Sequence, residues 1–275
     1  MRRAAIFATI ALAACRFDPS ALGPGGGSDA GPGGGSDAAH DARAIDARMI
    51  DAGPTPLTLV QMGSTVASPW GNSSSQIAVM LAAPTQAGSV IALYATYEHS
   101  FTQGGQQVDS VTDDKGNTYA VVDSLHDGGN GQDSATAYAM NVAAGTRTIT
   151  ANLHDSACCR IIIAHEIAGA STTAPLDGHK ANQDGNPGTN TGAVKTGSMT
   201  TSADGDYIFA ATSDASNASG QSIAAAGGAT LRVVATGGNP TVSEDQLQTT
   251  KGPIESAFTF SHNGAALSMQ MAFKR

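Results

Sequence analysis

Two adjacent cysteines, Cys158 and Cys159, offer the most easily named chemistry in this chain. In an oxidising compartment such a pair can close into a vicinal disulfide. Consecutive strand residues point to opposite faces, so this bond requires a distorted turn; the alternative places one thiol in the core and one at the surface. The pair lacks the Cys-X-X-Cys spacing of disulfide oxidoreductases, so we predict no redox activity.

Glu166 follows His165 at the end of an apolar stretch and is a candidate general base or sugar-binding carboxylate. The alternative is a structural carboxylate that pairs with Arg147 or Arg160. The chain contains no His-Glu-X-X-His motif, no Gly-X-Ser-X-Gly elbow and no P-loop. We therefore assign no catalytic residue, and an enzyme is the less favoured class.

Trp70 is the only tryptophan, and it lies in a predicted loop. An exposed tryptophan can stack on a sugar, whereas a buried one closes the end of a sandwich core. Aromatic residues make up only 5% of the chain, so few other stacking platforms are available. Trp70 is therefore a second candidate ligand-binding residue, beside Glu166.

Several aspartates in predicted turns could bind calcium, the one cofactor we consider. Hard cations take carboxylate and carbonyl oxygens, and secreted domains use weak calcium sites to fix loops. Aspartate is also common in turns for backbone reasons alone, and no EF-hand spacing is present. The candidates are Asp113, Asp114, Asp127, Asp133, Asp177 and Asp184.

The charge balance argues against a nucleic-acid partner. Asp and Glu number 23 against 14 Lys and Arg, which gives a formal net charge of −9. Phosphate recognition requires a basic patch, which this composition does not provide. An acidic surface instead favours solubility.

The N-terminus has the form of an export signal. Two arginines precede an apolar stretch at 4–14, which is too short to cross a bilayer, and Cys15 follows it. The boundary Leu12-Ala13-Ala14-Cys15 resembles the lipobox of bacterial lipoproteins, which implies an acylated Cys15 that anchors the chain in a membrane. Arg16 stands where an Asp would oppose transfer to the outer membrane, so we expect an outer-membrane lipoprotein of the cell envelope. The alternative is an ordinary secretory signal cut near Ala14.

Residues 15–55 are predicted to be a disordered linker after a signal peptide at 1–14. The octapeptide Gly-Pro-Gly-Gly-Gly-Ser-Asp-Ala occurs at 23–30 and again at 31–38. Such Gly-rich chain cannot bury enough apolar surface to offset its ordering entropy. The leader resembles in style those of myxobacterial surface lipoproteins.

Residues 56–275 are predicted to form one all-β domain, an antiparallel β-sandwich. Short β-branched and aromatic runs are bounded by Gly, Asn, Asp and Pro, and no sustained helical periodicity appears. The stretch 161–164 is apolar at every position, which predicts a central strand covered on both faces. Strands are predicted at 57–62, 76–82, 89–97, 108–112, 118–123, 134–140, 146–152, 159–168, 206–213, 230–235, 256–260 and 266–274, with weaker ones at 193–200 and 242–248. Loops are predicted at 124–133, 177–192 and 214–228.

Four segments of this domain, 111–119, 141–150, 166–169 and 175–177, resemble an uncharacterised module of secreted bacterial surface proteins. That module is similar to the jelly-roll-like sandwiches found beside adhesion and carbohydrate-associated domains. The resemblance implies a jelly-roll-like fold and implies no catalytic residue.

We therefore predict a membrane-anchored surface lipoprotein whose domain is a non-catalytic adhesion module for glycan or extracellular matrix. One alternative is a structural envelope lipoprotein without a small ligand. Another is a carbohydrate-active hydrolase, which requires two carboxylates facing each other across a cleft.

Overall fold

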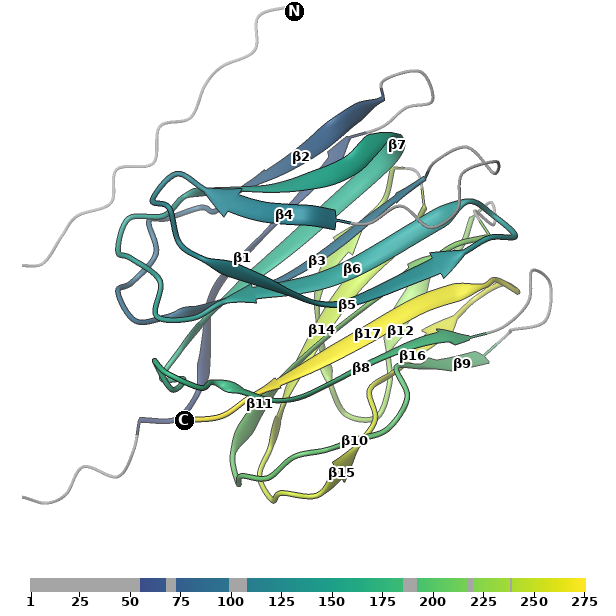
Figure 1. Cartoon of the computed structure of the whole chain (residues 1–275). Helices are drawn as coiled ribbons and strands as arrows, with labels where there is room; N and C mark the ends of the chain where they lie inside the picture. The colour runs from purple at the N-terminus through teal and green to yellow at the C-terminus, as the bar shows by residue number, and fades with distance from the viewer. Residues whose placement is uncertain (1–54, 68–72, 99–107, 185–191, 217–219, 238) are drawn as a thin grey trace, which may run out of the picture. The chain divides into compact units, whose positions relative to one another are not determined.

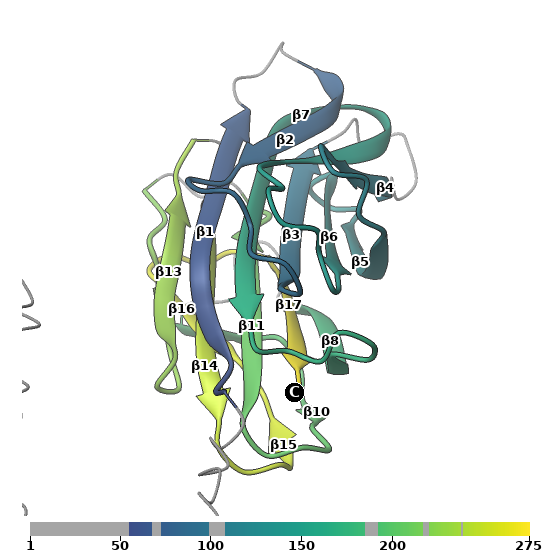
Figure 2. The same ribbon diagram turned by 90° about the vertical axis from the view of Figure 1, so that its left-hand side faces the viewer.

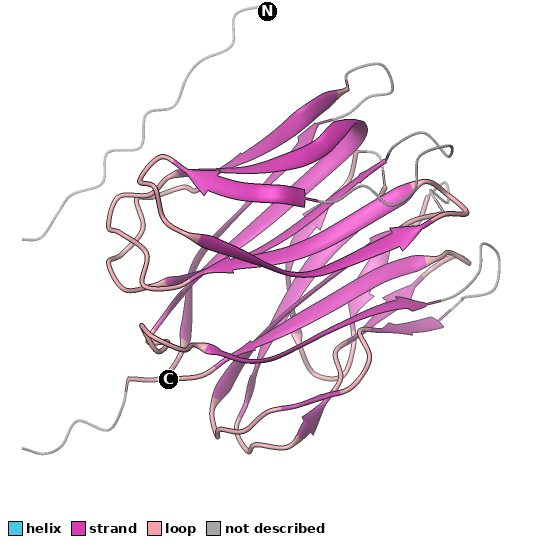
Figure 3. Ribbon diagram, in the orientation of Figure 1, coloured by secondary structure: helices cyan, strands magenta, loops and turns pink. Residues whose placement is uncertain are grey.

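The computed structural model describes residues 55–67, 73–98, 108–184, 192–216, 220–237 and 239–275. Every regular element within these residues is a strand, and the strands pair in antiparallel sheets (Figure 3). The predicted all-β antiparallel sandwich is confirmed. No helix capable of spanning a membrane occurs in this part of the chain. Cys15, the linker and Trp70 lie outside the described residues.

The first half of the domain forms one main sheet, whose strand order is β1-β7-β3-β6-β5 (Figure 1). The central strands are apolar because both of their faces are covered. Every residue of β3 is buried, and so is every residue of β7 from Cys159 to Ile167, as the apolar stretch at 161–164 predicted. The strands are β1 (Thr58–Ala67), β3 (Val90–Glu98), β5 (Tyr119–Asp127), β6 (Gln132–Ala139) and β7 (Thr148–Ala168).

The long strand β7 belongs to two layers. Its first residues pair with β2 (Ser74–Met80) and β4 (Val108–Asp113), and this small sheet covers the outer face of the main sheet. Sequence analysis predicted two separate strands here, at 146–152 and 159–168. The chain instead bends within a single strand, around three exposed residues at 154–156.

The second half forms the other main sheet, in the order β13-β14-β11-β17-β8. The predicted loop at 177–192 is wrong over its first part, which is β8. This strand is polar, and it lies at the sheet edge with β17 as its neighbour in the sheet, so it carries little of the apolar signal that marks a strand. The strands are β8 (Leu176–Asp184), β11 (Asp206–Asp214), β13 (Thr230–Ala235), β14 (Thr241–Gln248) and β17 (Ala266–Phe273).

Short strands cover the outer face of the second sheet. β12 (Ile223–Ala225), β16 (Ala257–Phe260) and β9 (Gly192–Lys195) form a small sheet whose Val194, Phe258 and Phe260 pack against β11 and β14. A second pair, β10 (Met199–Thr200) and β15 (Pro253–Ile254), adds to this cover. β12 falls within the predicted loop at 214–228, where a strand of three residues was too short to recognise.

The main core lies between the two large sheets. Tyr94 and Ile167 from the first sheet meet Phe209, Met271 and Phe273 from the second, and all are buried. β1 and β13 are edge strands of the two main sheets, and they lie side by side (Figure 2). A pocket lies at this edge of the sandwich.

Candidate functional site

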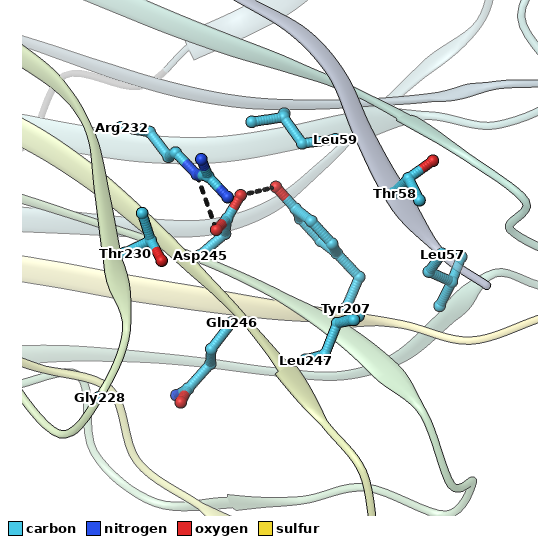
Figure 4. Close-up of a pocket in the computed structure, with 10 residues that line it drawn as sticks. All are labelled: Leu57, Thr58, Leu59, Tyr207, Gly228, Thr230, Arg232, Asp245, Gln246 and Leu247. Atoms are coloured by element: carbon cyan, nitrogen blue, oxygen red, sulfur yellow. Dashed lines mark hydrogen bonds and ion pairs between the residues drawn. The ribbon is translucent and has the colours of Figure 1, made fainter.

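A pocket of about 570 Å³ opens between β1 and the strands β13 and β14 (Figure 4). An apolar cluster that includes Val66, Ile161 and Val233 also joins β1 and β7 to β13. The pocket combines apolar side chains with polar groups from both sheets. Its lining consists of Leu57, Thr58, Leu59, Tyr207, Gly228, Thr230, Arg232, Asp245, Gln246 and Leu247.

A β-bulge directs Arg232 into this pocket. In the ladder between β13 and β14, Leu231 pairs with Glu244 and Val233 pairs with Ser243, so Arg232 is an extra residue. Such a bulge interrupts the alternation of faces and redirects a side chain. Leu231 packs against the short strands that cover the outer face of its sheet, whereas Arg232 and Val233 both face the space between the two main sheets.

Asp245 joins the arginine to the core. Arg232 Nε donates to Asp245 Oδ1 at 2.8 Å, and the Tyr207 hydroxyl donates to Asp245 Oδ2 at 2.5 Å (Figure 4). The arginine side chain is 33% exposed and the aspartate 4%, so the ion pair is formed at the boundary between pocket and core. Both carboxylate oxygens are therefore held by protein donors.

His165 extends the chain of hydrogen bonds inward. Its Nδ1 lies 3.3 Å from the Tyr207 hydroxyl, its Nε2 lies 2.9 Å from Ser243 Oγ, and its ring meets Phe209 edge-on. Burial, with a contribution from Arg232, lowers the pKa of His165 to about 3, so the ring is neutral. Because Tyr207 donates to Asp245, its oxygen accepts from Nδ1–H, and Nε2 then accepts from Ser243.

This polar chain is not a nucleophilic triad, although it contains serine, histidine and aspartate. Ser243 and His165 are fully buried, so no substrate reaches the serine hydroxyl. Burial and the adjacent Asp245 raise the pKa of Tyr207 far above its ordinary value, so the tyrosine remains a donor. The arrangement fixes Asp245 and Arg232 in place, and it suits binding rather than catalysis.

Glu166 faces the other side of β7 and lies outside the pocket. It is fully buried and accepts hydrogen bonds from Gln61 Nε2 at 2.6 Å, the Gln86 amide at 2.7 Å and Ser89 Oγ at 2.9 Å. The arginines suggested as its partners contact carbonyl oxygens instead, Arg147 those of Leu81 and Ala82, Arg160 those of Ser74 and Ala157. Glu166 is thus a buried, hydrogen-bonded carboxylate, and its predicted pairing with Arg147 or Arg160 is wrong.

The aspartates of the first calcium candidates accept hydrogen bonds within or near their own turns. Asp113 accepts from the Lys115 and Asn117 amides and from the Tyr119 hydroxyl, and these bonds outweigh burial to lower its pKa. Asp114 accepts from the Arg147 amide.

The other calcium candidates are placed in the same manner. Asp127 accepts from the Gly129 amide and from Asn130 Nδ2, while Asp133 pairs with His126 at 2.7 Å. Asp177 accepts from Ser202 and from Lys274 Nζ, and Asp184 accepts from the Lys195 amide. Among the described residues, none of the six belongs to a group of three His, Cys, Asp or Glu side chains close enough to share an ion.

No bond joins Cys158 and Cys159 in this structure, and the predicted disulfide remains a prediction. Cys159 is buried and Cys158 half-buried, which resembles the alternative with one thiol in the core and one at the surface. Their sulfur atoms nevertheless lie near each other and near Glu98.

Comparison of the chain with protein-family models, with curated proteins and with solved structures found no match. The pocket residues Tyr207, Arg232 and Asp245 were not singled out by sequence analysis. Their local signals are weak: one arginine within the apolar run of β13, and one acidic pair within β14.

Proposed function

We propose that the chain is an exported lipoprotein, tethered through Cys15, whose sandwich binds a neutral polar ligand of the saccharide class in the pocket between β1 and β13-β14. The observation that carries this proposal is the lining of that pocket, which combines a self-neutralised ion pair, neutral polar groups and leucines.

The charges in the pocket favour an uncharged ligand. Arg232 and Asp245 neutralise each other, so a strongly anionic or cationic ligand would have to compete with the existing pair. Thr58, Thr230 and Gln246 supply neutral donors and acceptors at the pocket wall. Hydroxyl groups of a sugar can exchange hydrogen bonds with these side chains and with the free N–H groups of Arg232.

The leucines supply the apolar contact that a sugar ring requires on its C–H face. Leu59 comes from β1, Leu57 is a buried residue just before that strand, and Leu247, which is 51% exposed, stands on β14. Ligand pockets generally combine mostly apolar walls with a few fixed polar groups. The buried chain through Tyr207 and His165 holds Asp245 rigid, which reduces the entropy lost on binding.

A hydrolase is not proposed, because Asp245 is the one carboxylate among the described residues that line this pocket. Glycosidases of the usual kind require a pair of carboxylates.

The test is a binding screen of the purified chain on glycans and cell-envelope polysaccharides, with calcium and with chelator. Leu247→Asp places a charge on the exposed pocket wall, and we expect it to reduce binding at least tenfold. Val234→Asp is the matched control, since Val234 is 57% exposed on the neighbouring strand and does not line the pocket. No binding to any glycan, or equal losses in both variants, would contradict the proposal and favour a structural envelope protein.

A further inference from the structure

Three potential metal ligands meet where β3 ends and β7 bends. The sulfur atoms of Cys158 and Cys159 and a carboxylate oxygen of Glu98 all lie within 4.8 Å of one another. Glu98 stands opposite Cys158 in the ladder between β3 and β7, and Cys158 Sγ lies 3.9 Å from Glu98 Oε2. This group is separate from the pocket and does not depend on the function proposed for it.

An irregularity in β7 brings adjacent cysteines to one place. Cys159 has a φ of 50°, in the left-handed region that residues other than glycine rarely adopt. The register of the ladder also shifts between Thr96 and Glu98, so β7 contains an extra residue here. The ordinary alternation of side chains is therefore interrupted, and neighbouring thiols can act together.

We propose that Cys158, Cys159 and Glu98 bind a thiophilic divalent cation of the zinc or cadmium class. Tetrahedral zinc with sulfur ligands at about 2.3 Å and an oxygen ligand at about 2.1 Å places sulfur and oxygen about 3.6 Å apart. The observed 3.9 Å between Cys158 Sγ and Glu98 Oε2 is close to this value. A fourth position remains for water or another ligand.

The charges around the group can be balanced when a divalent cation is bound. Binding replaces both thiol protons, with the charge of the cation opposing those of the thiolates and Glu98. Arg160, which is buried beside the thiols and anchored to the Ser74 and Ala157 carbonyls, balances the remaining negative charge.

The test is a cadmium titration of the reduced full chain carrying Cys15→Ser, which leaves Cys158 and Cys159 as its two thiols. We expect thiolate-to-metal charge-transfer absorption that saturates at one equivalent. Binding replaces the thiol protons, so the affinity should fall as the pH is lowered. Zinc should compete for the same site and suppress the signal.

Variants test the ligand set. Cys158→Ser or Cys159→Ser should abolish the one-equivalent signal, and Glu98→Gln should weaken binding by at least about tenfold, the lower bound seen even for outer-shell partners. Glu255→Gln is the matched control, because Glu255 pairs with Lys195 at the surface. Far-UV circular dichroism identifies any variant that fails to fold, in which case the effect of Glu98→Gln decides.

Three results would overturn the proposal. One is no binding by the folded chain. Another is a cadmium affinity that is the same in Glu98→Gln as in the unchanged chain, since the two thiols alone would then account for the binding. The third is quantitative loss of both thiols in air, within the monomer and in the presence of zinc, because the pair would then be a vicinal disulfide.

Discussion

Tyr94 and Tyr207 both project from central strands into the space between the main sheets, and both end in hydrogen-bonded hydroxyls. Around Tyr94 the partners are neutral: Ser134 Oγ and Ser213 Oγ at 2.9 Å, and the Leu267 carbonyl at 2.8 Å. Around Tyr207 the chain of bonds ends in the Arg232–Asp245 ion pair, which reaches a pocket. Each cluster therefore contains a buried, hydrogen-bonded tyrosine hydroxyl. The Tyr207 cluster also contains a charged pair that borders a pocket, and the Tyr94 cluster does not.

The difference shows which buried polar groups suggest a site. Burial raises the pKa of Tyr94 to about 12, yet its cluster is closed within the core and joins one sheet to the other. The Tyr207 cluster includes a charged pair with one partner partly in water. A perturbed pKa alone marks both regions, so access to solvent must decide between them.

The largest expected effect concerns His165. Its native pKa of about 3 lies below the ordinary 6.5, so between these values the unfolded state binds a proton that the native state does not. Stability should therefore fall as pH falls through this window, by about 1.4 kcal/mol per unit and about 5 kcal/mol in total. Urea unfolding at several pH values should show that His165→Gln, which keeps one donor and one acceptor, lacks this component. Equal pH profiles for both proteins would contradict a neutral, buried His165.

A similar effect of opposite sign is expected from Glu244, whose neighbour in β14 is Asp245. Glu244 is 1% exposed, and burial raises its pKa from 4.5 to about 8. The native state then holds the extra proton, so stability should fall as pH rises from 4.5 to 8, again by about 1.4 kcal/mol per unit. Glu244→Gln should remove this slope in the same unfolding series. If Glu244→Gln left the slope unchanged, another group would be responsible for the pH dependence. Asp206 would then be tested next, because its pKa is raised to about 7.

Asp245→Ala should have an intermediate effect on stability. It removes the partners of Arg232 and of the Tyr207 hydroxyl, and we expect a loss of about 2 kcal/mol, reduced because Arg232 is partly hydrated. The control Glu255→Ala breaks a surface pair and should cost much less than Asp245→Ala. Chemical denaturation measures both, and ligand binding should be lost only for Asp245→Ala.

The smallest effect is expected for Tyr94→Phe. It leaves the Leu267 carbonyl without this donor, while Ser134 and Ser213 retain other partners, so we expect a cost of about 1 kcal/mol. Glycan binding should not change. A loss of binding here would show that the two clusters are coupled, and would break the distinction drawn between them.

Most strands were predictable because their apolar residues face a core on one side or on both. The stretch 161–164 indicated a central strand, and β3 and β17 were recognised within a few residues. β8 was missed because an edge strand bears fewer apolar residues. Sequence analysis divided β7 into two strands because the residues at its bend are polar and exposed, as in a loop.

The pocket was not predictable in the same way. It depends on residues from β1, β11, β13 and β14, which are brought together by sheet pairing and by the bulge at Arg232. A bulge has no reliable mark in a single sequence. Glu166, which sequence analysis favoured as a candidate, shares β7 with His165 but faces the opposite side.

The length of β7 also sets an order of events during folding. Among the described residues, β1 and β2 have their ladder partners only in β7, with Thr58 opposite Ala168 and Met80 opposite Thr148. A chain that emerges from its N-terminus must therefore leave β2 unpaired until residues 148–157 have followed, and β1 until residues 160–168 have followed. Contacts of such long range form slowly. Hydrophobic strands that stay unpaired are prone to aggregate. A chaperone would therefore be of most use while the chain is still being synthesised.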